Sequence, residues 1–169
     1  TIGCHGFTNV MRSCVQDRLL PGRGVAWVRY CSTYEPMGEE KTQITDDAQK
    51  PEERVSYEQA IPDYVYWEDF GHNVARTWEE VTIVWRKVYM NRAQLVKRFP
   101  DSGKEIPLDH VPKSLKDERT SEAGKKACIY EGWDKEAGVV WFLSKSHPQL
   151  IEHKADPLQL TGTFPCPKP

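Results

Sequence analysis

The sequence predicts an α+β fold: mainly an antiparallel β-sheet, with an N-terminal amphipathic helix and a short helix near 91–99. Three observations support this class: an apolar pattern of helical period at the start, several stretches that alternate apolar and polar residues, and short hairpin-type connections. Helices and strands do not alternate regularly, as they do in parallel α/β folds. With 169 residues, the chain fits a single domain over 1–169.

The first predicted element is a helix whose apolar residues recur every three or four positions. These residues are Phe7, Val10, Met11, Cys14, Val15 and Leu19. The run PGRG at 21–24 then supplies residues that commonly end a helix. We expect an amphipathic helix whose apolar face packs on the sheet.

Four strands are predicted before residue 91, because four stretches are rich in β-branched and aromatic residues. They span 25–34, 54–61, 63–70 and 80–90, and Pro62 separates the second from the third. The last is the clearest: one face carries Val81, Ile83, Trp85 and Tyr89, and the other carries Thr82, Val84, Arg86 and Val88. We expect these strands to form the sheet that the helix covers.

A short helix is predicted next, over 92–99. Asn91 precedes it and is well suited to accept hydrogen bonds from the first amides of the helix. Leu95, Val96 and Phe99 are expected to point inward. This helix should therefore pack on the sheet through three apolar residues.

The last third of the chain predicts one hairpin and an extended tail. Strands at 127–133 and 139–144 flank a connection that ends in Gly138, a residue suited to a positive φ. The tail contains Pro157, Pro165, Pro167 and Pro169. We expect these prolines to hold it extended and to keep it out of the interior of a sheet.

Two polar stretches, about 35–54 and 101–126, are predicted to be flexible loops. Residues 35–69 contain eleven acids and three bases, whereas residues 86–126 contain eleven bases and six acids. If these segments lie on opposite flanks, copies of the chain could pack side by side in a ring through unlike surfaces. Two independent solvated loops explain the charge pattern equally well.

Composition argues against several classes of protein. A net charge of −2 and a pI near 6.2 disfavour tight nucleic-acid binding, which needs basic residues on phosphates. Five cysteines at irregular spacing indicate no disulfide framework and fit a reducing compartment. No apolar run approaches a membrane span, and the N-terminus lacks the pattern of a secretory leader. Because the chain begins at Thr1 and ends in a proline-rich run, we expect an excised segment of a longer protein.

No residue pattern predicts an enzyme. Cys4, His5 and Cys14 lack the ligand spacing of a structural zinc site, and no G-x-S-x-G nucleophile turn occurs. The G-x-G at 22–24 follows a helix and precedes a strand, the reverse of a phosphate-binding loop. We therefore predict no catalytic, metal-binding or cofactor-binding residues, and no cofactor.

Two other functions stay open. The first is a carboxylate-dependent hydrolase or nuclease-like enzyme that uses acids among Glu68, Asp69, Glu79 and Glu80. Adjacent acids on a strand point to opposite faces, which argues against such a pair. The second is a single-stranded nucleic-acid-binding domain that stacks bases on Trp67, Trp78 and Trp141.

Aromatic residues gather near the predicted strands. The chain has six tryptophans and seven tyrosines, and packing in cores and interfaces is their commoner use. The residues predicted for packing or for an interface are Trp67, Phe70, Arg76, Trp78 and Trp133.

Six segments, taken in order, point to a known family. They are DRLLPGRGV at 17–25, YVYWEDF at 64–70, ARTWEEV at 75–81, YMNR at 89–92, EGWDK at 131–135 and TFPCPKP at 163–169. This ordered set resembles the portal proteins, or head-to-tail connectors, of podovirus-type tailed bacteriophages. It spans nearly the whole chain, and the acidic and basic stretches near 35–55 and 101–126 depart from it.

The resemblance implies a structural role. A portal is a ring, typically a dodecamer, at one vertex of the capsid, and this chain would be the wing region of one subunit. Its partners would be other portal subunits and the capsid, terminase and tail proteins, with DNA met only in passage through the assembled channel. The location would be the virion, after assembly in the host cytoplasm and with no membrane partner. A channel that lets DNA slide has little need of phosphate contacts, which agrees with the near-neutral charge.

Overall fold

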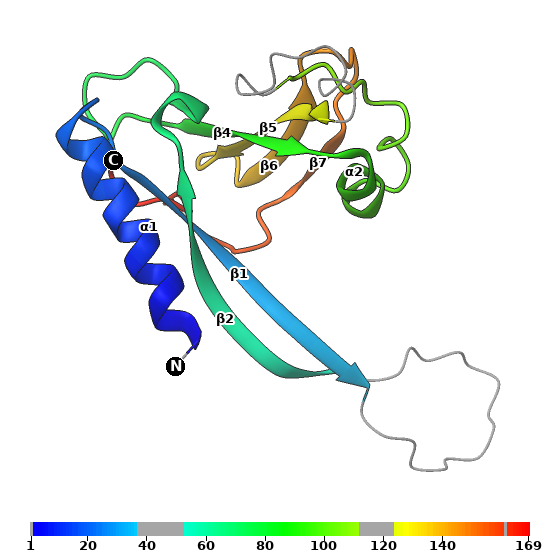
Figure 1. Cartoon of the computed structure of the whole chain (residues 1–169), viewed down its shortest axis with the longest axis horizontal. Coiled ribbons are helices and arrows are strands. Elements are labelled where there is room, and N and C mark those ends of the chain that lie inside the picture. Colours follow the sequence, from blue (N-terminus) through cyan, green and yellow to red (C-terminus); the bar gives the residue numbers. More distant parts are fainter. Residues whose placement is uncertain (1, 37–52, 112–123, 161) are drawn as a thin grey trace.

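The computed structural model describes residues 2–36, 53–111, 124–160 and 162–169. Within these residues the predicted α+β class is confirmed, and every pair of neighbouring strands is antiparallel. The strands form two sheets. One is a two-stranded hairpin of β1 (Val25–Pro36) and β2 (Glu53–Val65), which we call the arm, and the other has five strands. Figure 1 shows the arm running away from the five-stranded sheet.

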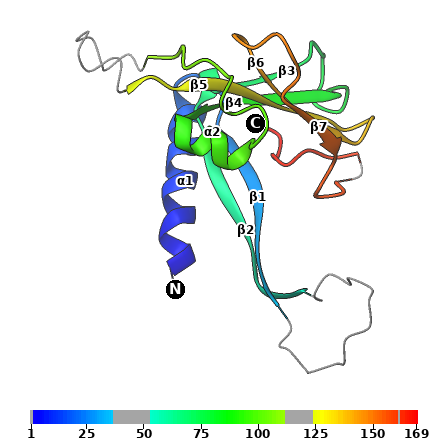
Figure 2. The ribbon, with the colours of Figure 1, turned by 90° about the vertical axis from the view of Figure 1, so that its right-hand side faces the viewer.

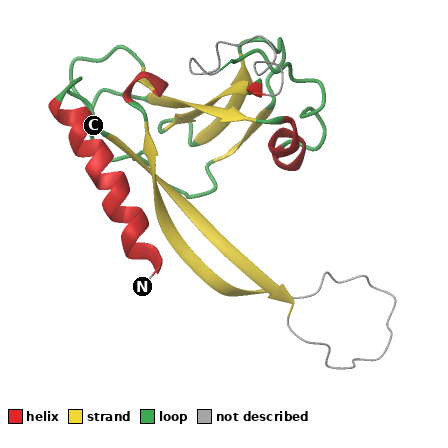
Figure 3. Ribbon diagram, viewed as in Figure 1, coloured by secondary structure: helices red, strands yellow, loops and turns green. Residues whose placement is uncertain are grey.

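The five-stranded sheet has the order β3-β4-β5-β6-β7. Its strands are β3 (Phe70–His72), β4 (Ile83–Met90), β5 (Ala127–Asp134), β6 (Val139–Ser144) and β7 (Glu152–Ala155). The predicted hairpin of β5 and β6 is confirmed, and Gly138 in its connection has a φ of 63°. The polar sequence of β7 does not predict a strand. It forms one by pairing with the edge of β6 (Figure 3).

β4 begins at Ile83 rather than at Glu80. The side-chain Oδ1 of Asn73 accepts hydrogen bonds from the amides of Thr82 and Ile83, at 3.0 and 3.1 Å. The amide of Asn73 in turn donates to the Ile83 carbonyl at 3.1 Å. These bonds take the place of strand pairing before Ile83.

The arm is continuous, so the prediction that Pro62 ends a strand is wrong. β1 and β2 pair along their whole length. Pro62 lies opposite Val28, whose amide donates to the Pro165 carbonyl at 2.7 Å and therefore points away from β2. A proline at such a position removes no hydrogen bond from the ladder.

The prediction of a strand over 63–70 is wrong in its second half. β2 ends at Val65, and a 3-10 turn, η1 (Trp67–Asp69), leads into β3. The Asp69 amide donates to the Tyr66 carbonyl at 2.9 Å and closes this turn. The turn redirects the chain from the arm into the five-stranded sheet.

Helix α1 (Ile2–Leu19) confirms the predicted N-terminal helix but not its packing. Of the apolar residues expected to face the sheet, only Cys14 is buried, whereas Phe7 is 54% exposed and Leu19 77%. Figure 2 shows α1 and the arm extending from the same side of the five-stranded sheet. No helix within the described ranges is long and apolar enough to cross a membrane.

The C-terminal half of α1 is fixed to the base of the arm. A Cβ on Gly24 would come within 2.1 Å of the Cys14 carbonyl oxygen, so the backbones meet closely there. The Tyr64 hydroxyl of β2 donates to the Asp17 carboxylate at 2.6 Å. α1 is therefore attached through its last turns, and its apolar row stays open to solvent.

Helix α2 (Arg92–Arg98) confirms the predicted short helix and its cap. The Gln94 amide donates to the Asn91 side chain at 2.9 Å, and the Asn91 amide donates to the Gln94 side chain at 3.0 Å. This reciprocal pair is a capping box. Leu95 and Phe99 are buried, as predicted, and Val96 is half-buried.

The two predicted loops lie partly outside the described residues. In the first, 37–52 is not described, and the residues on either side belong to β1 and β2. In the second, 112–123 is not described. The part before it packs against α2, because Ile106 is buried in the core and the Gly103 amide donates to the Phe99 carbonyl at 2.8 Å.

The core lies on one face of the five-stranded sheet, which we call the core face. Strand alternation and register place Val84, Ile129, Trp133, Val140 and Phe142 on it. Against it pack Val25, Trp27 and Val65 of the arm, Leu95 and Phe99, and Cys166 of the C-terminal segment. The opposite face carries half-exposed aromatic residues: Trp85, Tyr89, Tyr130 and Trp141.

Candidate functional site

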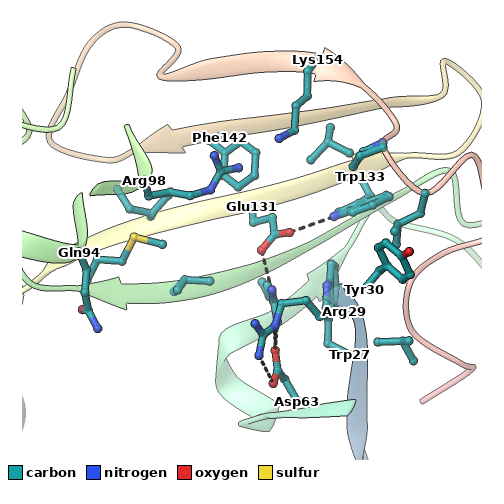
Figure 4. A pocket seen from close by; sticks show the side chains of 18 of the residues that line it. Trp27, Arg29, Tyr30, Asp63, Gln94, Arg98, Glu131, Trp133, Phe142 and Lys154 are labelled. Atoms are coloured by element: carbon teal, nitrogen blue, oxygen red, sulfur yellow. Dashed lines mark hydrogen bonds and ion pairs between the residues drawn. The ribbon is translucent and has the colours of Figure 1, made fainter. Parts of the chain in front are cut away.

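A hollow of about 830 Å³ opens on the core face, between the base of the arm, α2 and the segment after β7 (Figure 4). Its charged lining consists of Arg29, Asp63, Arg86, Lys97, Arg98, Glu131 and Lys154. We call this hollow the basic pocket. Its volume lies within the range of natural ligand sites.

The floor of the basic pocket is apolar because strand alternation aims one set of side chains at it. Ile129 of β5 and Val140 and Phe142 of β6 belong to this set. Phe142 packs edge-on against Phe99 at the end of α2, with ring centres 5.4 Å apart. The floor and the helix that borders it are thus joined by the core.

A largely buried ion pair lies within the basic pocket. Arg86 and Glu131 are direct cross-strand partners, joined at 2.8 Å, and each side chain is 13% exposed. Glu131 also accepts from the Trp133 indole at 3.3 Å, and the Arg86 guanidinium lies 4.6 Å from the centre of the Trp27 ring. These extra contacts offset part of the desolvation cost of the pair.

Asp63 extends this ion pair to the arm. Its carboxylate accepts two hydrogen bonds from Arg29, at 2.9 and 3.3 Å, and lies 3.8 Å from Arg86. The hydrogen bond to Asp63 raises the pKa of Arg29. The alternating charges Arg29, Asp63, Arg86 and Glu131 therefore tie the base of the arm to the five-stranded sheet.

Three more cations stand at the rim: Lys97 and Arg98 of α2, and Lys154 of β7. The charged groups of Arg98 and Lys154 lie 5.0 and 5.6 Å from the centre of the Phe142 ring, within cation–π range. Glu152 lies 3.1 Å from Arg98 and 3.5 Å from Lys154. Because a single carboxylate faces three cations, the rim keeps a net positive charge.

The basic pocket suits a ligand that presents anionic groups next to apolar ones. Trp27 and Trp133 border it, but their side chains are buried and meet edge to face, 6.3 Å apart. Their ring faces are therefore closed to stacking with a nucleobase. The pocket therefore offers cations and apolar side chains to a ligand, and no open tryptophan face.

The residues predicted for packing or for an interface fall in different places. Trp133 is the one of the five that lines the basic pocket, and Phe70 is buried in the core. Arg76 and Trp78 share a separate hollow of about 240 Å³. Trp67 is half-buried in η1. Phe70 and Trp133 also share the core cluster, and Trp78 packs against it.

The four acids of the hydrolase alternative lie in two places. Glu68 and Asp69 belong to η1, and the Tyr89 hydroxyl donates to Asp69 at 2.9 Å. Glu79 and Glu80 are exposed in the connection before β4. A hydrogen bond from its own backbone amide lowers the pKa of Glu79. Among the described residues, no group of three or more His, Cys, Asp or Glu side chains could hold a metal ion.

The three tryptophans of the nucleic-acid alternative each pack on the protein itself. Trp67 tilts against Tyr66, with ring centres 5.8 Å apart. Trp78 meets Phe164 edge-on at 5.7 Å. Trp141 lies over Gly132, where an added Cβ would come within 2.0 Å of its ring. They sit on η1, on the connection before β4 and on β6.

The described cysteines Cys14, Cys31, Cys128 and Cys166 are free thiols. Burial raises the pKa of Cys166 to about 12. Burial also raises the pKa of Cys14 and Cys128. These three thiols therefore stay protonated near neutral pH, which disfavours a nucleophilic role for them.

Exposed apolar side chains form two surfaces outside the floor of the basic pocket. One is a row on α1, the α1 stripe, composed of Phe7, Met11, Val15 and Leu19. These residues are spaced four apart and so follow one side of the helix. The other lies toward the far end of the arm and contains the cross-strand pair Tyr34 and Val55, whereas Tyr57 is exposed on the opposite face of the arm. Contiguous exposed apolar surface commonly marks a contact with another molecule.

No protein-family model matches the chain, and a search of curated proteins finds no match. Any assignment of function to the basic pocket, the α1 stripe and the arm therefore depends on the residues themselves.

Proposed function

We propose that the chain is a structural, non-catalytic segment of a bacteriophage portal subunit, from the wing region of the ring through which DNA is packaged and ejected. Its partners would be neighbouring portal subunits and the capsid, terminase and tail proteins at the portal vertex of the virion. The ordered segments from 17–25 to 163–169 that resemble this family support the proposal. DNA would meet the assembled channel only in passage.

The α1 stripe is the observation that carries this proposal. Covering apolar surface stabilises an assembly by roughly 25 cal/mol per Å². Monomeric proteins rarely leave a contiguous apolar row on a helix open to water. A subunit of a closed ring has neighbours that can cover such a row, and the exposed end of the arm suits the same purpose.

Ring formation tests the proposal directly. The chain is expressed together with the sequence that follows it in its natural protein, and the product is imaged by electron microscopy. We expect discrete rings. Particles that stay monomeric at all concentrations would contradict the portal assignment.

A matched pair of variants tests the contribution of the α1 stripe. Val15→Lys places a charge in the stripe, whereas Val74→Lys makes the same change at a fully exposed site in the connection before β4. Both should leave the melting temperature of the isolated chain unchanged, since both sites are exposed. Val15→Lys should prevent ring assembly, and Val74→Lys should not.

The two alternative functions predict different results with the isolated chain. A hydrolase or nuclease should bind a divalent cation at Glu68 and Asp69 or at Glu79 and Glu80, detectable by soaking a crystal. A single-strand-binding domain should show a change in tryptophan fluorescence when an oligonucleotide is added at low salt. The portal proposal expects neither signal.

A further inference from the structure

We propose that the basic pocket binds the acidic end of the arm of a second copy of the chain, so that copies join head to tail. This inference rests on the proposed function, because it names the surfaces through which neighbouring subunits meet. The acidic arm end is the stretch 35–53, with seven acids and two bases. Residues 37–52 lie outside the described residues.

The charge of the basic pocket favours an acidic partner. Arg29 and Arg86 are already paired with Asp63 and Glu131. The rim adds three cations, Lys97, Arg98 and Lys154, and only one carboxylate, that of Glu152. A segment that carries an excess of five acids would complete this rim with charge-assisted hydrogen bonds.

The apolar side chains of the two surfaces also match. Tyr34, Val55 and Tyr57 are exposed on the arm, next to its acidic end. The floor residues Val140 and Phe142 are buried, but Val28 and Tyr30, which also line the pocket, are 39% and 43% exposed. An arm that enters a neighbouring pocket would therefore place apolar side chains beside Val28 and Tyr30 and acids against the rim.

The direction of the arm favours a second copy over the arm's own pocket. β1 lines the basic pocket from Trp27 onward and continues to Pro36. A strand of that length spans about 30 Å at roughly 3.3 Å per residue. Figure 1 shows the arm pointing away from the five-stranded sheet. Pro36 and Glu53, the described residues that flank residues 37–52, therefore lie at the end of the arm remote from its own pocket.

The two surfaces differ, so the contact is heterologous. Such a contact repeats from copy to copy and closes into a ring when the rotation between copies permits. It leaves the α1 stripe available for a separate contact.

Charge reversal on each side tests the contact in the chain as given. Lys97→Glu with Lys154→Glu reverses the rim of the pocket, and Glu39→Lys with Glu40→Lys reverses the arm end. Self-association is measured by sedimentation at low salt, where attraction between exposed charges is screened least. Each reversal should weaken association at least about tenfold. A chain that carries both reversals should recover the wild-type association.

Failure of the recovery would overturn the inference, as would a wild type that stays monomeric at low salt. If the chain's own arm end occupied the pocket, the wild type would stay monomeric at low salt. Circular dichroism and melting temperatures of all variants establish that they fold alike.

The ring-formation experiment on the longer protein separates the two proposals. Rings that persist after pocket reversal would overturn the arm contact and leave the portal proposal standing. If no rings form but the charge swap restores self-association of the present chain, the portal proposal fails and the arm contact stands.

Discussion

The five-stranded sheet and the pair formed by α1 and the arm use apolar residues in opposite ways. In the sheet, the apolar side chains of the core face are buried against α2 and the base of the arm. On α1 and the outer arm, side chains of the same chemistry are exposed. Helix α2 buries Leu95 completely, whereas α1 leaves Leu19 77% exposed, although both helices have apolar residues at helical spacing. Periodicity therefore identifies the apolar side of an element, and tertiary structure determines what covers it.

The strongest test of this contrast is the same substitution in both helices. Leu95→Ala should lower the free energy of unfolding by about 3 kcal/mol, because it opens a cavity in the core. Leu19→Ala removes the same atoms from an exposed site and should change it by less than about 0.5 kcal/mol. Urea denaturation measures both values. Equal losses would mean that α1 is covered by its own chain after all.

Charged groups should show the same contrast with a smaller effect. Glu131→Gln leaves Arg86, in a largely buried site, with only the longer 3.8 Å contact to Asp63 and should cost about 2 kcal/mol. On the arm, Glu58 accepts a hydrogen bond from the Tyr30 hydroxyl at 2.7 Å in an exposed position. Glu58→Gln should cost less than about 0.5 kcal/mol. Comparable losses in urea denaturation would show that the arm is as closely packed as the sheet.

Glycines provide a third comparison. Gly132→Ala would force its methyl group against the Trp141 ring and should cost about 1.5 kcal/mol. Gly6 lies in α1 with open space around it, so Gly6→Ala should be neutral or stabilise the helix by up to about 1 kcal/mol. Thermal melting distinguishes the two variants by the sign of the shift. A loss at Gly6 would indicate a close neighbour of α1.

Local pattern predicted most of the fold because alternation and caps are local properties. β4, β5 and β6 follow their alternation, and Asn91 caps α2 as its sequence predicts. β7 was not predicted because it becomes a strand by pairing with the edge of β6, and its own residues carry no strand pattern. Pro62 looked like a strand end because the sequence does not reveal that it lies opposite Val28, at a position where the ladder has no hydrogen bond to lose.

The basic pocket could not be predicted because its residues come from separate elements whose register is set by pairing. In β4 the face with Trp85 has the larger aromatic side chains, yet the face with Val84 and Arg86 is the core face. One signal was present: Arg86 and Glu131 are charged residues inside strands, where a buried charge needs a partner. Only the register between β4 and β5 shows that Arg86 and Glu131 are partners.

The junction between α1 and the arm gives the smallest expected effect and a dependence on pH. Burial, followed by the hydrogen bond to Asp17, raises the pKa of Tyr64 above its ordinary value. Tyr64→Phe should therefore cost about 1 kcal/mol at neutral pH, and Tyr34→Phe on the outer arm much less.

The folded state favours the protonated form of the Tyr64 hydroxyl, and this preference sets the sign of the pH effect. Because the folded pKa of Tyr64 lies above the unfolded value near about 10, its stabilisation is complete below that pH and is lost as the pH rises through the folded pKa. Urea midpoints between about pH 8 and about pH 11 should fall less steeply for Tyr64→Phe than for the wild type. Parallel curves for Tyr64→Phe and the wild type would mean that α1 is not held to the arm through this hydroxyl.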